Sequence, residues 1–222
     1  PDFTWIKDRS AANTHVLFDS VRGGTKQLFS NLTNSEQTNT DLTNGFASDG
    51  FIVGDNITGT GATNLNSNTY VAWNWKAGGT AVSNTAGTIT SQVSANTTAG
   101  FSIVSYTGNG TIGATIGHGL SSAPEMMIFK NRSGSGQWNV YHSSLGNTKY
   151  MLLDTANAQA TSTWLTNTNP SNSLFTLSNF GDTNASASTY IAYCFNSVEG
   201  YSKFGSYTGN GSADGTFVYT GF

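Results

Sequence analysis

Thr69-Tyr-Val-Ala-Trp-Asn-Trp75 returns later in the chain as Thr189-Tyr-Ile-Ala-Tyr-Cys-Phe195. Both stretches are short, rich in aromatic and β-branched residues, and bounded by Asn, Ser or Gly nearby, which is typical of β-strands. Alternate residues of a strand lie on one face of the sheet. Bulky apolar side chains therefore share a face in each copy: Val71, Trp73 and Trp75 in the first, and Ile191, Tyr193 and Phe195 in the second. We expect that face to form the core between sheets.

The duplication extends well beyond these strands. Residues 1–32 align without a gap onto residues 124–155, and Ser105-Tyr-Thr-Gly-Asn-Gly110 returns letter for letter as residues 206–211. A period this long exceeds that of solenoid and propeller repeats, so the units should be small domains in tandem. Tandem domains of one kind favour an extended protein with multivalent contacts over an enzyme.

Period-two patterns dominate the rest of the chain. No segment of 11 or more residues shows convincing helical periodicity, and residues 156–159 would make one turn at most. Gly23-Gly24 and, in the second copy, Gly146-Asn147 mark tight hairpin turns. We predict an all-β protein built of tandem antiparallel β-sandwich units of the jelly-roll or lectin-like kind.

The phase of the repeat divides the chain into four segments. Residues 1–76 are the body of the first unit, 77–100 a spacer or edge ribbon, and 101–200 the second unit. Residues 201–222 are either the leading hairpin of a following unit or a strand that completes the first unit. Since 101–123 precede Pro124 as 201–222 would precede a further proline, we expect the parent protein to continue in both directions.

Composition excludes several classes of function. Net charge is −3 and the pI about 5.4, with no basic cluster, which argues against nucleic acid as a partner. The apolar runs are too short for a transmembrane helix, so no membrane insertion is expected. The lone Cys194 lies in an apolar strand, which predicts a buried free thiol rather than a nucleophile.

Aromatic side chains are the first candidates for ligand binding, because the C–H faces of sugars stack on rings. Core or inter-unit packing is the alternative for each tryptophan. Alternation places Trp138, Val140 and His142 on one face of a strand, and this pattern favours burial of Trp138. The aromatic candidates are Trp138, Tyr141, His142 and Trp164, with Trp5 and Trp75 as further ones.

Two cations recur at equal spacing, Lys7 with Arg9 and Lys130 with Arg132. Alternation sends both side chains of a pair to the same face. Lys130 and Arg132 could therefore recognise an acidic surface sugar. The alternative is that such residues solvate an exposed sheet edge and discourage edge-to-edge pairing.

Metal binding and catalysis have weaker support. Ca²⁺ could be held by oxygens of Asp182 with Asn184, or of Asp49 with Asp55 and Asn56, although loop capping is the alternative; no other cofactor is expected. The three histidines form no zinc-binding pair, and the sequence lacks a Gly-x-Ser-x-Gly elbow. Carboxylates placed across a cleft, as a glycosidase needs, are not indicated. We expect a protein that is not an enzyme.

Two signatures carry a resemblance to a known family. Pro-Asp/Glu-x-x-Trp/Ile-x-Lys-x-Arg-Ser begins at Pro1 and at Pro124, and Gly200-Tyr-Ser-Lys-Phe-Gly-Ser-Tyr-Thr-Gly-Asn-Gly ends at Gly211. Together with the Tyr-Val/Ile-Ala strands, they resemble a repeat of large virion proteins of marine bacteriophages, described as tail-fibre or appendage proteins. The resemblance implies an extracellular structural role and a sandwich similar to concanavalin A-like or laminin-G-like domains. It supplies no catalytic residues.

The sequence thus predicts a segment of a virion appendage, such as a tail fibre, that projects and adheres to host surface polysaccharide with avidity from repeated copies. A purely architectural spacer or decoration protein is the second hypothesis, and a glycan depolymerase domain the third. The first copy has Trp73-Asn-Trp75 where the second has Tyr-Cys-Phe, which argues against one ligand for both copies. Partners would be other virion subunits, and the resemblance to fibres implies a homo-oligomer, with a trimer expected.

Overall fold

A computed structural model of the protein describes residues 1–55 and 61–221. Nearly all its regular structure is β, and every pair of named strands is antiparallel, which confirms the predicted all-β sandwich class. Within the described residues, α1 (Gly181–Asn184) is the single helical turn, and it lies outside the 156–159 stretch. No helix in these ranges is long and apolar enough to span a membrane.

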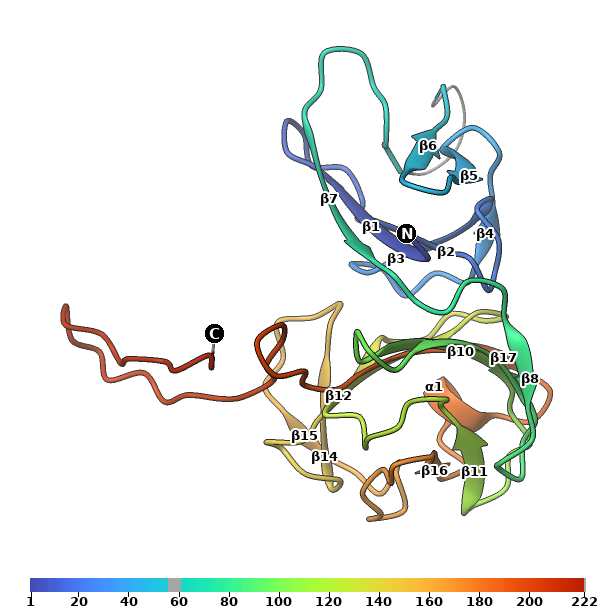
Figure 1. The fold of residues 1–222 in the computed structure, drawn as a ribbon, viewed down its shortest axis with the longest axis vertical. Helices are drawn as coiled ribbons and strands as arrows, with labels where there is room; N and C mark the ends of the chain where they lie inside the picture. Colours follow the sequence, from blue (N-terminus) through green and yellow to red (C-terminus); the bar gives the residue numbers. More distant parts are fainter. Residues whose placement is uncertain (56–60, 222) are drawn as a thin grey trace.

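The first unit is the upper half of Figure 1, a five-stranded sheet covered on one side by a two-stranded ribbon. Its own core lies between these layers and contains Ile6, Phe18 and Phe29. The sheet has the order β4-β3-β2-β1-β7: β4 (Gln37–Thr38), β3 (Lys26–Phe29), β2 (Val16–Asp19), β1 (Phe3–Asp8) and β7 (Tyr70–Trp75). The ribbon pairs β5 (Thr43–Phe46) with β6 (Phe51–Val53).

The second unit is built on an eight-stranded sheet, with a two-stranded layer on its far side (Figure 1). The sheet has the order β15 (Ala160–Thr161), β14 (Lys149–Leu152), β13 (Asn139–His142), β12 (Met126–Asn131), β17 (Thr189–Phe195), β10 (Phe101–Thr107), β9 (Ser91–Asn96) and β8 (Val82–Asn84). The far layer pairs β11 (Ala114–Gly117) with β16 (Leu174–Leu177). Residues 77–100 thus supply β8, the edge strand of this sheet, and β9, the strand next to it.

The two units repeat the same strand pairings. β1 lies between β2 and β7 as β12 lies between β13 and β17. Lys7 stands opposite Val71, and Lys130 stands opposite Ile191. Side-chain contacts repeat as well: the hydroxyl of Tyr70 accepts the N–H of Leu65 at 2.9 Å, and that of Tyr190 accepts the N–H of Ala185 at 2.8 Å. The shared residues therefore occupy equivalent places in both copies.

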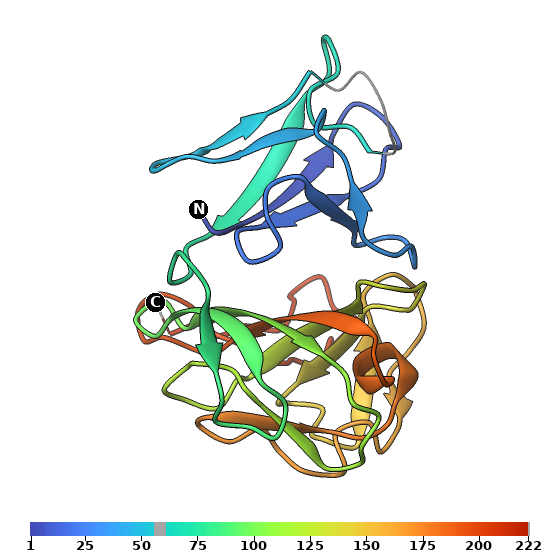
Figure 2. The same cartoon turned by 90° about the vertical axis from the view of Figure 1, so that its right-hand side faces the viewer.

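The central sheet of the second unit is covered on both faces, so the molecule has four β layers (Figure 2). On β17, Tyr190, Ala192 and Cys194 face the β11–β16 layer. Ile191, Tyr193 and Phe195 face the other way and pack against the sheet of the first unit. Their face forms a core between sheets, as expected, but those sheets belong to different units. Burial of both faces explains why Thr189-Tyr-Ile-Ala-Tyr-Cys-Phe195 is apolar almost throughout.

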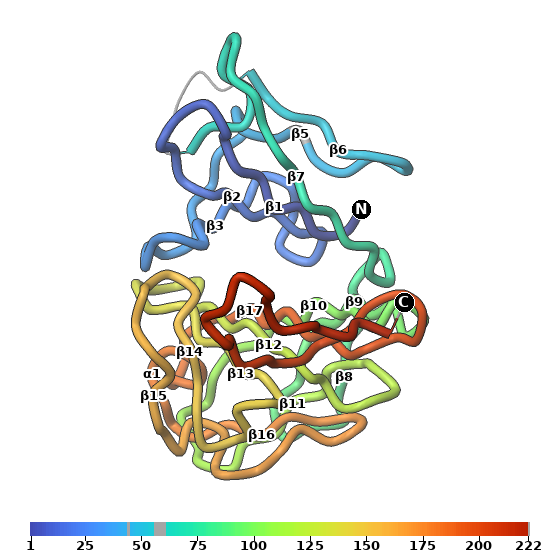
Figure 3. Tube along the Cα trace, turned by 90° about the vertical axis from the view of Figure 1, so that its left-hand side faces the viewer, coloured from blue at the N-terminus to red at the C-terminus, as the bar shows by residue number. Residues whose placement is uncertain are grey.

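Residues 205–221, called the arm below, leave the body as an extended segment (Figures 1 and 3). Every one of these described residues is exposed and none belongs to a strand. Phe204 at the root of the arm packs against Phe195, with ring centroids 5.9 Å apart. The repeated hexapeptide within the arm is therefore not built into a sheet as its copy in β10 is.

Candidate functional site

The residues that the sequence marks for ligand binding gather mainly at the contact between the two units. Trp138 immediately precedes β13 and is fully buried. Its indole N–H donates to the carbonyl oxygens of Phe29, at 2.8 Å, and Leu32, at 3.1 Å, both in the first unit. Val140 lies in the same apolar cluster, as strand alternation predicts. The ring therefore fills the inter-unit core instead of offering a face to solvent.

Lys130 also points from β12 toward the first unit. Its ammonium group donates to the carbonyl oxygens of Thr33, at 3.0 Å, and Gly136, at 2.8 Å, and the residue is fully buried. Burial lowers the pKa of this amine to about 8, although the negative charges of Asp154 and Asp182 partly oppose the shift. Lys130 thus does not solvate a sheet edge, because it ties a loop of the first unit to the second.

Arg132 lies on the same face, as predicted, and forms a bidentate ion pair across the units. Its Nε and Nη2 donate to the two carboxylate oxygens of Glu36 at 2.8 and 3.0 Å. Nη1 donates to Ser105 Oγ at 2.9 Å. A bidentate pair fixes both distance and angle between its partners, so this contact sets the orientation of one unit against the other.

Glu36 also connects Arg132 to a buried cluster that sequence reasoning missed. Arg22 donates to Glu36 at 3.2 Å and, through Nε, to Asp19 at 2.5 Å. Tyr193 of the second unit donates its hydroxyl proton to the same Asp19 at 2.7 Å. The side chains of Asp19 and Arg22 are wholly inaccessible to solvent. The only sequence signal was the close spacing of Asp19 and Arg22 at a hairpin end.

Mutual neutralisation keeps this buried cluster charged. Burial by itself would raise the pKa of Glu36, but the hydrogen bonds and charges of Arg132 and Arg22 outweigh it and hold the pKa below its usual value. Burial opposes the charge of Arg22, yet Asp19 and Glu36 hold its pKa above the usual value. Glu36 and Arg22 are therefore both ionised at neutral pH, and the cluster acts as a fixed electrostatic lock.

Lys130 predicts a pH dependence of stability. Its pKa is about 8 when folded, below the model-compound value of 10.5, so the unfolded chain holds the proton more tightly between these values. At pH 7 the buried amine is protonated, so folding bears the full free-energy cost of burying its charge. This cost falls as the pH rises toward 10, because the folded amine loses its proton. The free energy of unfolding of the natural chain, relative to that of Lys130→Met, should therefore rise by on the order of 2 kcal/mol between pH 7 and 10. Urea unfolding at several pH values measures this change.

Lys7→Met is the matched control, because Lys7 holds the equivalent strand position and its ammonium group makes the equivalent bond to the carbonyl of Asn13, at 3.2 Å, while remaining partly exposed. The difference in free energy of unfolding between the natural chain and Lys7→Met should change less with pH than the difference for Lys130→Met. An equal change for both variants would contradict a specific effect of Lys130.

The other aromatic candidates are divided between core and surface. Tyr141 and Trp164 lie in the core of the second unit, where Trp164 packs edge-on against Phe129 at 5.3 Å. His142 is half-buried, and its Nδ1 accepts the N–H of Ser144 at 3.2 Å. Of the tryptophans, Trp5 and Trp75 are partly buried between the units, and Trp73 is 47% exposed. Trp73 is thus the most open tryptophan and meets Trp5 at 6.0 Å in an edge-to-face arrangement.

The candidate metal residues brace a turn. Asn184 is buried; its Oδ1 accepts the N–H of Asn109 at 3.0 Å, and its Nδ2 donates to the carbonyls of Thr111 and Ser178. Asp182 lies close to Gly136, where a β-carbon would come within 2.6 Å of its carboxylate. Asp49 and Asp55 are exposed, and Asn56 lies outside the described residues. Across residues 1–55 and 61–221, no three His, Cys, Asp or Glu side chains gather as a metal-binding group.

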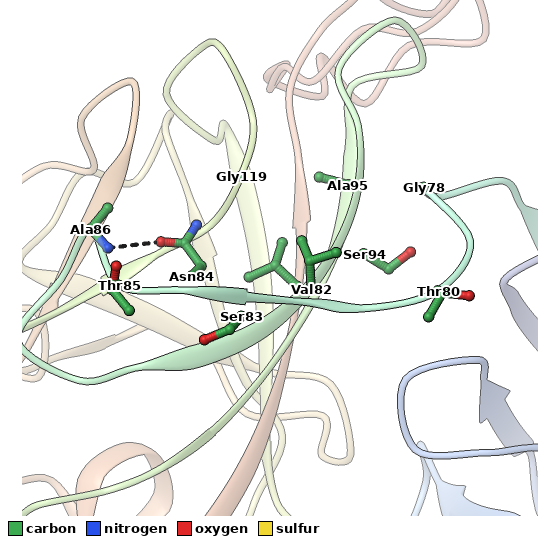
Figure 4. A pocket seen from close by; sticks show the side chains of 11 residues that line it. Gly78, Thr80, Val82, Ser83, Asn84, Thr85, Ala86, Ser94, Ala95 and Gly119 are labelled. Atoms are coloured by element: carbon green, nitrogen blue, oxygen red, sulfur yellow. Dashed lines mark hydrogen bonds between the residues drawn. The ribbon is translucent and has the colours of Figure 1, made fainter.

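One open pocket of about 560 Å³ lies between β8, β9 and the loop at Gly119 (Figure 4). The eleven described residues that line it are small, and they include neither an aromatic ring nor a charged group. Asn84 turns inward to accept the N–H of Ala86 at 3.0 Å. The pocket therefore lacks the stacking platform that sugar recognition uses. Cys194 is fully buried, as predicted, and burial raises its thiol pKa to about 12.

Comparison with known proteins places the chain by family. The model of a family described as a domain of unknown function (DUF7483) matches residues 1–222. The chain belongs to this family. Searches among curated proteins and among solved structures found no match.

In this DUF7483 domain, the charged and aromatic side chains that could carry chemistry are used largely for contact between units. Lys130, Arg132 and Trp138 each bond to a different part of residues 29–36. Together they hold one loop of the first unit on the face of the second. These bonds fix the two β-sandwiches in one relative orientation.

Proposed function

We propose that this chain is an architectural segment of an extracellular virion appendage, a spacer that holds two β-sandwich units rigidly end to end. The observation that carries the proposal is the inter-unit lock formed by Trp138, Lys130, Arg132 and the Asp19–Arg22–Glu36 cluster. A flexible linker between domains needs no such bonds, whereas a rigid spacer needs them to keep its units in a fixed relative orientation. The resemblance to phage appendage repeats supplies the location and the expected partners, which are other virion subunits.

Host adhesion is the second candidate, and one observation favours it. Trp73 is 47% exposed and stands beside Trp5 at the rim between the units, where a sugar ring could stack. The site would be shallow and weak, so it would depend on avidity from many copies. Enzymatic action on glycans has less support, because Asp19 and Glu36 are engaged in ion pairs.

Binding to host polysaccharide distinguishes the two functions. A spacer should show no retention on immobilised polysaccharide beyond that of its Trp73→Ala variant. Adhesion predicts measurable retention that falls at least tenfold in Trp73→Ala, the loss of about 1.4 kcal/mol that one ring–sugar contact can supply. Val82→Ala is the control, because Val82 is 64% exposed and lies in β8 of the second unit, whereas Trp5 and Trp73 lie in the sheet of the first unit. Retention lost only in Trp73→Ala would overturn the pure spacer.

A further inference from the structure

The two units differ in one respect that the repeat makes visible. In the second unit β17 lies between β12 and β10, and every residue after Thr189 is buried. In the first unit the equivalent strand β7 lies at the edge of its sheet, with β1 as its sole partner among the described strands, and each of its residues is at least partly exposed. The first unit therefore lacks a strand in the place that β10 fills in the second.

The missing strand is present in the sequence of the arm and its root. Residues 206–211 repeat residues 105–110 letter for letter, and β10 contains the start of that hexapeptide. Continued without a gap, the alignment matches Ile116 of β11 to Phe217 and Tyr106 to Tyr207. Tyr106 and Ile116 are buried, at 4% and 0% exposure, whereas Tyr207 and Phe217 are 70% and 86% exposed. The arm thus carries apolar residues that their counterparts bury.

A glycine supplies independent support. At Gly108 a β-carbon would come within 2.4 Å of the carbonyl oxygen of Ala185, so the docked turn requires glycine there. The arm keeps glycine at the matching position, Gly209, where nothing lies within 4 Å. The counterpart of Ala185 in the first unit is Leu65, and the counterpart of the bracing Asn184 is the exposed Asn64. The arm and the first unit therefore hold matching halves of the contact that is complete in the second unit.

We propose that residues 202–208 of one copy, the counterparts of β10, add as a strand to the free edge of β7 in a second copy of this chain. The register follows from β10 and β17, where Ser102 pairs with Cys194 and Tyr106 with Tyr190. Transferred by the repeat, Lys203 of the donor stands opposite Asn74 of the acceptor, and Tyr207 stands opposite Tyr70. Strand addition satisfies the backbone groups of an open edge, and the Tyr106–Tyr190 stack, at 5.3 Å between centroids, predicts a matching Tyr207–Tyr70 stack.

A second copy is the occupant that the structure favours. Ser202 and Phe204 line the same pocket, of about 280 Å³, as Trp75 at the end of β7. The edge is thus within reach of the chain's own arm, yet the arm extends away from the body and leaves it empty (Figures 1 and 3). Donation to another copy uses different surfaces on donor and acceptor, a heterologous contact that propagates head to tail. The proposal is independent of whether the segment spaces or adheres.

Disulfide trapping between two different variants tests the donation. Asn74→Cys and Lys203→Cys chains are mixed and mildly oxidised, and non-reducing electrophoresis measures linked heterodimers. The pair copies Ser102 and Cys194, which stand directly opposite each other on neighbouring strands, so it should link readily. We expect at least tenfold more heterodimer than from Asn74→Cys mixed with Ser212→Cys, a control on the same arm outside the predicted strand.

Equal yields from the two mixtures would overturn the proposal. The Asn74→Cys/Lys203→Cys double variant gives a second reading, because an internally linked monomer as its main product would show that the arm closes on its own chain, which also overturns it. Cys194 stays in place, since it is fully buried.

Association of the uncrosslinked chain provides a further check. The average mass of the natural chain in sedimentation equilibrium should rise with concentration, and Tyr207→Asp should remove the rise while Ser212→Asp, with the same added charge, should not. Both side chains are exposed in the single chain, so neither change should unfold it. A natural chain that stays monomeric throughout would refute the donation.

Discussion

Arg22→Ala should lower the free energy of unfolding by about 3–5 kcal/mol, the cost of leaving a buried charge without its partner. Arg22 is the sole cation bonded to Asp19 among the described residues, and both side chains are wholly buried. Its loss also removes bonds to Glu36 and to the hydroxyl of Tyr193 in the other unit. The buried carboxylate of Asp19 then lacks its cationic partner. Urea unfolding at pH 7 followed by tryptophan fluorescence measures the change.

Lys76→Ala is the control for this substitution. Lys76 pairs with Asp2 at 3.0 Å, but its side chain is 66% exposed, so the pair should contribute less than about 1 kcal/mol. If Arg22→Ala cost no more than Lys76→Ala, the buried cluster would not hold the units together.

Acid should weaken the same lock. The pKa of Glu36 is lower in the folded than in the unfolded state, so its contribution to stability is complete above the unfolded value and is lost as the pH falls through the folded one. The stability difference between the natural chain and Glu36→Gln should therefore shrink below about pH 4, near the ordinary carboxyl pKa.

Much of the fold follows from the repeat and from period-two patterning. Lys7 and Lys130 lie in equivalent strands, and the residues that follow them make equivalent local bonds: Asp8 accepts the N–H of Ser10 through its Oδ1, and Asn131 accepts that of Ser133 in the same way. Alternation also places Trp138 and Val140 together, as the structure has them. Such local signals are carried by neighbours in sequence, so one chain suffices to detect them.

The contact between units could not be predicted in this way. Glu36 lies in a polar segment that looks like solvated loop, and its role depends on Arg132, far along the chain. Alternation shows that Ile191, Tyr193 and Phe195 share a face, but it cannot show which sheet covers that face. Those assignments depend on how two sheets stack, a long-range property that no spacing in the sequence encodes.

Trp138→Ala should be comparably damaging, because the indole is fully buried between the two sheets. Truncation of a buried aromatic side chain leaves a cavity and costs about 3–5 kcal/mol. It also leaves two carbonyl groups of the first unit, at Phe29 and Leu32, without this donor. Since the ring belongs to the second unit and its acceptors to the first, the loss should fall on the coupling of the units. The natural chain should unfold in one transition and the variant in two.

Calorimetry of three chains separates this coupling from general damage. Trp164→Ala removes an equally buried indole from the core of the second unit, whose N–H bonds within its own unit, to Lys149. That variant should unfold at a lower temperature but still in one transition, because the contact between the two units is intact. Trp138→Ala should instead leave the stability of each separate sandwich nearly unchanged and remove the stabilisation that comes from the contact between them. If both variants unfolded in one transition at the same temperature, the two sandwiches would form a single cooperative block in which Trp138 has no special place.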